Sequence, residues 1–358
     1  MLLVMAPWAD PVPMKRAWCL WEMLCALQLK DRVVLHVRLS PGEKKPFRAK
    51  LAEEVMNMLV RVDAKKAQAY LPHDREMIFE SIKETIGFNA LNEQVKTFLR
   101  LWCLETAEEA VDLAFDGQSL VADNIGEDEH DDLLDLGRLA GSVASMLDDY
   151  GRHDKALEYH AKALAIKRAV LGDDHPDTAG TYHNMAVVCK NQGQYDKALG
   201  YYEKALAIRR AVFGDDHPHT ASTYNNMASV YDNQGQYDKA LEYYEKALAI
   251  RRAVLGDDHP DTAMTYNDMA NVYLDQGQYD KALEYYGKAL AISRAVLGDD
   301  HPSTASTYNN MAAVKDRQGK SEELLAIERA VDDHPHTAGT DNTRANVSKQ
   351  QGSCCELL

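Results

Sequence analysis

The sequence has little positive charge and no long apolar stretch. Its 40 lysines and arginines are outnumbered by 56 aspartates and glutamates, which gives a formal net charge of −16. A protein that neutralises nucleic-acid phosphates needs a basic surface, so this balance argues against a nucleic-acid partner. No apolar stretch approaches the ~20 residues of a membrane-spanning helix, and Pro7 comes before any signal-peptide pattern is established. We therefore expect a cytoplasmic protein with no integral membrane segment.

Cysteine and the common catalytic motifs are also scarce. The six cysteines are scattered without Cys-x-x-Cys spacing, which predicts reduced thiols and neither a disulfide framework nor a zinc site. No Gly-x-Ser-x-Gly element is present, and no serine or cysteine has histidine and aspartate partners at a spacing typical of a nucleophile. The sequence predicts a protein that is not an enzyme and that has no cofactor and no metal.

A repeat dominates the rest of the chain. The tetrapeptide Asp-Asp-His-Pro recurs every 42 residues, with its histidine at 175, 217, 259 and 301. Each period contains two amphipathic helical patterns, with glycine and proline only at the joints; in one unit these patterns cover about 220–233 and 237–254. Gly235 is expected to end the first helix in the left-handed conformation. Asp258 is the expected N-cap of the next unit.

This unit resembles the tetratricopeptide repeat. The small and aromatic positions of that motif are met by Ala228, Tyr231, Ala240, Tyr244 and Ala247. The longer period, together with Leu-Gly-Asp-Asp-His-Pro, resembles the repeats of kinesin light chains. The resemblance implies a mainly α fold, a right-handed solenoid that acts as a non-enzymatic adaptor. Association with the cytoskeleton is one further implication. Kinesin heavy chain is one partner that it implies, although no heptad pattern precedes the repeats.

The resemblance also implies that the first helix of each unit lines a concave groove that binds proteins or peptides. Asparagine both donates and accepts hydrogen bonds, so a column of asparagines can pair with an extended peptide or a helix end. The alternative is that these are solvated helix faces. Four aspartates at the same positions, Asp232, Asp268, Asp275 and Asp316, argue against an acidic partner segment. The predicted groove residues are His183, Asn184, Lys190, Asn191, Asn225, Asn226, Ser229, Asn233, Asn267, Asn271, Asn309, Asn310 and Arg317.

The N-terminal third has a different pattern. Residues 1–5 and 32–39 are typical of strands, and 15–27 of a helix between them, which predicts a parallel strand pair; helical patterns follow at 44–60, 74–86 and 91–114. The Trp18-Cys19-x-x-Glu22 segment resembles an element of Toll/interleukin receptor (TIR) domains. That resemblance implies a small α/β domain, with Glu22 as a candidate acid for NAD cleavage in a signalling protein whose repeats act as a sensor arm. The strands expected before this element are lacking, so we expect an incomplete domain.

These patterns divide the chain into four segments. The first is the partial α/β domain with its helical extension, and an acidic linker separates it from the repeats. The last is a degenerate repeat with a tail, in which Cys355 and Cys354 fit a lipidation signal; an unmodified tail is the alternative. The predicted segments are 1–114, 115–132, 133–331 and 332–358.

Overall fold

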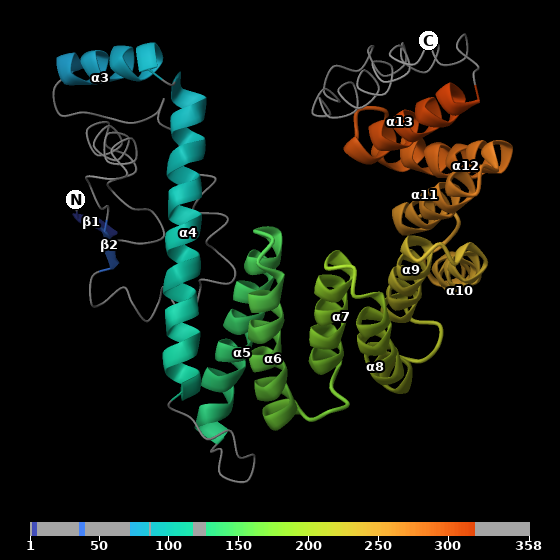
Figure 1. Ribbon diagram of the computed structural model, residues 1–358, viewed down its shortest axis with the longest axis horizontal. Helices are drawn as coiled ribbons and strands as arrows, with labels where there is room; N and C mark the ends of the chain where they lie inside the picture. The colour runs from blue at the N-terminus through green and yellow to red at the C-terminus, as the bar shows by residue number, and fades with distance from the viewer. Residues whose placement is uncertain (1, 6–35, 40–71, 86, 117–126, 319–358) are drawn as a thin grey trace, which may run out of the picture. The chain divides into compact units, whose positions relative to one another are not determined.

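The computed structural model describes residues 2–5, 36–39, 72–85, 87–116 and 127–318 (Figure 1). The chain divides into two compact units, 1–192 and 193–358, which we describe separately. Several predictions lie outside the described residues. These are the helices at 15–27 and 44–60, Glu22, and the C-terminal segment with Cys355.

In the first unit, strands β1 (Leu2–Met5) and β2 (His36–Leu39) pair in parallel, with Leu2 opposite His36. This confirms the predicted parallel pairing of these two segments. Two strands of four residues do not make a domain, and the described part of the chain shows no α/β domain. The TIR-like resemblance is therefore unsupported by the described residues.

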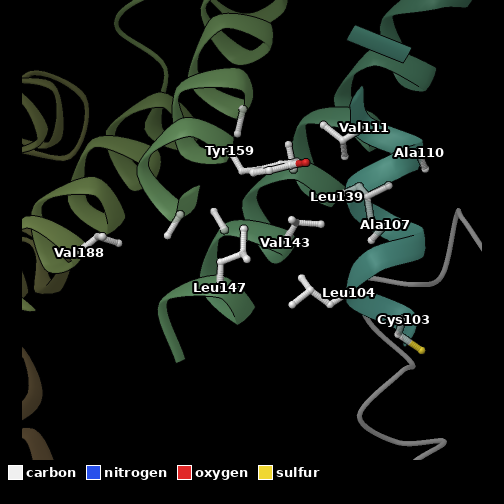
Figure 2. Close-up of a cluster of buried hydrophobic side chains, with 14 of the residues drawn as sticks. Cys103, Leu104, Ala107, Ala110, Val111, Leu139, Val143, Leu147, Tyr159 and Val188 are labelled. Carbon is white, nitrogen blue, oxygen red and sulfur yellow. The ribbon is translucent and has the colours of Figure 1, made fainter. Parts of the chain in front are cut away.

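A continuous apolar core joins the helices of the first unit. Figure 2 shows Leu104 and Val111 of α4 directed toward Val143 and Leu147 of α5, with Tyr159 of α6 beside them. The buried face of α4, which lies in the segment predicted as the N-terminal domain and its helical extension, packs on the first repeat helices α5 and α6. A terminal repeat needs such a cover because it has no neighbour on one side. The helices are α3 (Pro72–Thr85), α4 (Gly87–Asp116), α5 (Glu127–Asp149), α6 (His153–Leu171) and α7 (Pro176–Asn191).

The acidic run was expected to belong to a solvated linker, but the structure begins α5 at Glu127. Residues 127–132 form its first turns. Carboxylates near a helix N-terminus interact favourably with the helix dipole and with the unpaired N–H groups there. An acidic run can therefore start a helix as readily as it can form a linker.

The second unit is a run of paired helices. Each helix from α8 to α12 contacts the one that follows it (Figure 1). Their order confirms the two helical patterns predicted for each 42-residue period. The helices are α8 (Tyr195–Phe213), α9 (Pro218–Asn233), α10 (Tyr237–Leu255), α11 (Pro260–Asp275), α12 (Tyr279–Leu297) and α13 (Pro302–Arg317).

Small residues set the close packing of these helices. Ala240 and Ala247 of α10 are fully buried, as predicted, because a missing side chain lets the neighbouring helix approach. Tyr244 lies between them and packs against Met269 and Val272 of α11. The contact between successive repeats thus depends on one large ring flanked by alanines.

The joints between helices contain one confirmed prediction and one correction. Gly235 has φ of 71°, the left-handed conformation predicted for it. The N-cap of α11, however, is His259 and not Asp258, because the His259 Nδ1 accepts a hydrogen bond from the Asp261 N–H at 3.1 Å. The equivalent histidines at 175, 217 and 301 cap α7, α9 and α13 in the same way. The recurring histidine is therefore a capping residue.

Candidate functional site

The predicted groove residues of the second unit lie on α9, α11 and α13, and the structure brings these helices together. The Asn225 Nδ2 of α9 donates to the Asp268 Oδ2 of α11 at 3.0 Å. The Asn310 Nδ2 of α13 lies 3.4 Å from the Asn267 Oδ1 of α11. We call the polar positions of these three helices the polar row: Asn225, Asn226, Ser229, Asp232, Asn233, Asn267, Asp268, Asn271, Asp275, Asn309, Asn310, Asp316 and Arg317.

Some members of the polar row hold the fold together. Asn225 is only 6% exposed, and its oxygen accepts a hydrogen bond from Arg251 while its amide donates to Asp268. The Asn271 oxygen accepts from the Tyr286 hydroxyl. These two amides have structural partners within the repeats, which the sequence pattern alone did not show.

Other members face solvent to a greater degree. Asn233 at the end of α9 and Arg317 at the end of α13 are exposed. Asn226, Ser229 and Asn309 are half-buried, and the Ser229 hydroxyl hydrogen-bonds to Tyr244. Fewer residues of the row are thus exposed to solvent than the predicted groove set contains.

Two carboxylates of the row act on a third, Asp232. The Asp232 Oδ1 is buried and has no hydrogen-bond partner among the described residues. Burial, and then the negative charges of Asp275 and Asp268, raise the pKa of Asp232 to about 6. Like charges this close disfavour the ionised form. An additional negative charge near Asp232 would be repelled at neutral pH.

The remaining predicted groove residues lie on α7, in the first unit. Asn184 is exposed, and His183 and Lys190 are half-buried. The Asn191 Nδ2 donates to the Asp148 Oδ2 of α5 at 3.0 Å. Asn191 therefore connects two first helices in this unit, as Asn225 does in the second.

A buried cation clamp, which we did not predict from the sequence, joins successive repeats. The Arg251 Nη1 of α10 donates to the Thr265 Oγ1 at 2.6 Å and to the Asp261 carbonyl at 2.9 Å, both on α11. It also reaches the Asn225 Oδ1 of α9 at 3.3 Å. Burial lowers the pKa of Arg251, and the charges of Asp261 and Asp268 act in the opposite direction. One guanidinium thus ties three helices together.

The clamp recurs with the repeat. Arg209 of α8 donates to the Thr223 Oγ1 at 2.6 Å and to the His219 carbonyl at 3.1 Å. In the first unit, Lys167 donates to the Thr181 Oγ1 at 3.0 Å and to the Asp177 carbonyl at 3.4 Å. The signal was visible in the sequence as a cation eight residues before each of three His-Pro pairs.

Little in the described chain resembles a catalytic or metal centre. Burial raises the pKa of the Cys103 thiol to about 12, which leaves it protonated and unreactive at neutral pH. Within 2–5, 36–39, 72–85, 87–116 and 127–318, no three histidine, cysteine or carboxylate side chains are grouped to hold a metal ion. The helices of the same ranges include none with the length and apolarity needed to cross a membrane.

Comparisons with solved structures find several similar chains. BtubC (BKLC) from P. vanneervenii is 23% identical, with a TM-score of 0.53 over 68% of this chain and 91% of that chain. A putative kinesin light chain of Podosopora anserina with nearly identical TPR-like repeats is 24% identical, with a TM-score of 0.48 over 56% of this chain and 96% of that one. The Rap conjugation gene regulator of plasmid pLS20, in complex with the Phr* peptide, is 16% identical, with a TM-score of 0.49 over 80% and 74% of the two chains. Curated proteins gave no match.

The family follows from the repeats themselves. The tetratricopeptide repeat model matches four overlapping stretches, at 135–210, 177–253, 220–294 and 261–330. Together these stretches span more than half of the 358 residues. They include the helix pairs, the left-handed glycine joints and the alanine and tyrosine packing described above. The chain belongs to the tetratricopeptide repeat family.

Proposed function

We propose that this protein is a non-enzymatic scaffold that binds a peptide or helical segment of a partner protein along the polar row. The observation that carries the proposal is the joining of α9, α11 and α13 by hydrogen bonds between their polar positions, through Asn225 and Asp268 and through Asn310 and Asn267. A row held in place in this way is ordered before its ligand arrives. Binding then loses less conformational entropy than it would on a flexible surface.

The partner chemistry follows from the side chains of the row. Asn226 on α9 and Asn309 on α13 offer amide donors and acceptors on two first helices of the row, which suits the polar backbone of an extended segment or a helix end. The carboxylates of Asp232, Asp268 and Asp275 disfavour an acidic segment. We infer a partner segment that is neutral or positively charged.

A kinesin light chain-like adaptor role is the finer form of this proposal. The 42-residue period and the Asp-Asp-His-Pro joint support it. In that form the partner segment is a cargo peptide, and kinesin heavy chain is an additional partner. Recovery of a heavy chain together with the cargo would distinguish this adaptor from a general scaffold.

The test is affinity capture from cell lysate with the full chain as bait, followed by mass spectrometry. The polar-row variant carries Asn226→Ala and Asn309→Ala. The control variant carries Glu203→Ala and Glu245→Ala, at exposed, equivalent positions of the second helices α8 and α10. We expect the wild type and the control to recover the same partner, and the polar-row variant to recover at least about tenfold less, as the loss of ~1.4 kcal/mol of binding free energy would produce.

The captured partner is then reduced to a synthetic segment and its affinity measured by calorimetry. The melting temperature of each bait is measured in parallel, and it should not differ between the two variants. Equal recovery by the wild type and the polar-row variant would place the binding surface elsewhere on the chain.

A further inference from the structure

We propose that the interface between α12 and α13 binds a guanidinium group, which an arginine of the partner segment supplies. This inference rests on the proposed scaffold function, and it names one residue that the partner segment carries. It comes from comparing the same position in four successive repeats.

Three of the four repeats supply a cation of their own at this position. Lys167, Arg209 and Arg251 each extend from the end of a second helix to a threonine hydroxyl and a first-turn carbonyl of the next first helix. The two arginines make the shorter bond to threonine, at 2.6 Å, compared with 3.0 Å for the lysine. A threonine hydroxyl and a first-turn carbonyl thus accept a cation in each of these three repeats.

In the fourth repeat the cation is replaced but its acceptors remain. The equivalent residue of α12 is Ser293, which is 5% exposed and too short to reach α13 as the arginines reach α9 and α11. The Thr307 hydroxyl donates to the Ser303 carbonyl at 3.0 Å, as Thr265 donates to the Asp261 carbonyl at 3.1 Å in the preceding repeat. From 127 to 318, no lysine or arginine donates to Thr307.

The third acceptor of the clamp is also present. Arg251 reaches the Asn225 Oδ1, and the residue equivalent to Asn225 in the next repeat is Asn267. The Asn267 Oδ1 has one long contact, at 3.4 Å, with Asn310. Its second lone pair can accept a further donor.

The number of acceptors favours a guanidinium, because Arg251 reaches three acceptors of this kind whereas the ammonium of Lys167 reaches two. The acceptors at the interface between α12 and α13 are two neutral oxygens of side chains and one carbonyl, with Asn310 and Ser303 at the positions where Arg251 has Asp268 and Asp261. A metal ion or an ammonium depends mainly on charge, whereas a guanidinium presents five N–H donors in a fixed plane. Arg209, held by the Thr223 hydroxyl and the His219 carbonyl, demonstrates the same neutral type of binding.

The location of the acceptors connects them to the partner segment. Asn267 and Asn310 are members of the polar row, so a segment that binds along α11 and α13 passes these acceptors. An arginine of that segment would bind Thr307, Ser303 and Asn267 as Arg251 binds Thr265, Asp261 and Asn225. The partner would thereby link α12 to α13 as the protein's own arginines link the earlier helices.

The experiment uses N-ethylguanidinium chloride as the probe, with the full-length protein and with sodium chloride at equal ionic strength as the reference. Thermal unfolding is measured for the wild type and for Ser293→Arg and Ser293→Lys, which place the cation of the other repeats in the chain. Arg251→Ser is the matched control, because it recreates the same acceptor set one repeat earlier. At a probe concentration ten times its dissociation constant, we expect the wild-type melting temperature to rise by about 3–6 °C.

The Ser293→Arg and Ser293→Lys variants should melt at a higher temperature than the wild type and should not respond to the probe. The Arg251→Ser variant should melt at a lower temperature and should recover part of the loss with the probe. An unchanged wild-type melting temperature, or an equal rise in the wild type and in Ser293→Arg, would overturn the proposal. Either result would leave the proposed scaffold function standing if capture still depended on Asn226 and Asn309.

Discussion

The buried cores of the two units differ in the side chains that form them and in their continuity. In the first unit a continuous core of branched aliphatic side chains, including Leu104, Val111 and Val143, runs from α3 to α7. In the second unit the apolar contacts form small separate clusters, each with alanines around a tyrosine such as Tyr244. The first core gains stability from the volume of its side chains, and the second from the close approach of its helices.

This difference reflects the position of each core in the array. The first repeat has no repeat before it, so α3 and α4 must bury its outer face with large side chains. An internal repeat is covered on both sides by copies of itself, and the same few contacts recur at each joint. The first core should therefore be most sensitive to the removal of side-chain volume, and the second to its addition.

The largest effect is expected from removing volume in the first unit. Leu104→Ala leaves a cavity at a fully buried site and should lower the free energy of unfolding by ~2–5 kcal/mol. Urea unfolding measures the change, and segment-resolved hydrogen exchange locates it. Protection should fall in α4–α6 and be retained in α9–α12. Uniform loss of protection through α12 would mean that the two cores unfold as one.

A smaller effect is expected from adding volume in the second unit. Ala240→Leu places a larger side chain where α10 lies close to its neighbours, and overpacking should destabilise by ~1–3 kcal/mol. Ala249→Leu, at an exposed position of the same helix, is the matched control and should change stability by less than ~0.5 kcal/mol. Equal unfolding curves for the two variants would contradict the close packing described for α10.

The smallest effect concerns a position where the two units differ in one side chain. Tyr202, Tyr244 and Tyr286 occupy this position in the second unit, and His160 occupies it in the first. His160 is buried, and its Nδ1 has no hydrogen-bond partner among the described residues. Burial lowers the pKa of His160 to about 4; the charge of Asp148 opposes the shift and that of Lys167 adds to it.

The direction of the pH dependence follows from this shift. An unfolded histidine binds its proton near pH 6.5, so between about pH 6.5 and 4 the unfolded chain holds a proton that the folded chain lacks. Stability from this group is present above pH 6.5 and decreases as the pH falls toward 4. Between pH 7.5 and 5.5 the wild type should lose about 1 kcal/mol more than the His160→Tyr variant, measured by urea unfolding. Parallel pH profiles for the two proteins would contradict a neutral, buried His160.

The features that the sequence predicted depend on residues close together in the chain. The 42-residue period, the helix pairs, the left-handed Gly235 and the buried Ala240 and Ala247 all follow from local periodicity and backbone sterics. The capping residue was wrong by one position. Aspartate is among the preferred N-cap residues, and only the loop geometry shows that the His259 imidazole accepts the bond instead.

The features that the sequence did not predict depend on pairings across repeats. Asn225 was predicted to bind a ligand because its amide both donates and accepts hydrogen bonds. Its partners are instead Asp268, which follows 43 positions later, and Arg251, which follows 26 positions later. No periodic pattern shows which rotamer an amide adopts or which neighbour it bonds. The packing of α4 was not predicted for a related reason, since its core partners come from α5 and α6.

The joint between repeats has a consequence for how the array can change in length. Each loop holds its own contacts: Arg252 pairs with Asp257, the Thr262 hydroxyl donates to the Gly256 carbonyl, and His259 caps the helix that follows. The adjoining loops make the same contacts through the equivalent residues of their own repeats. Excision of 42 residues between two such loops would join chemically equivalent ends. The length of the array is thus free to vary in whole units, by duplication or deletion, without a new joint having to arise.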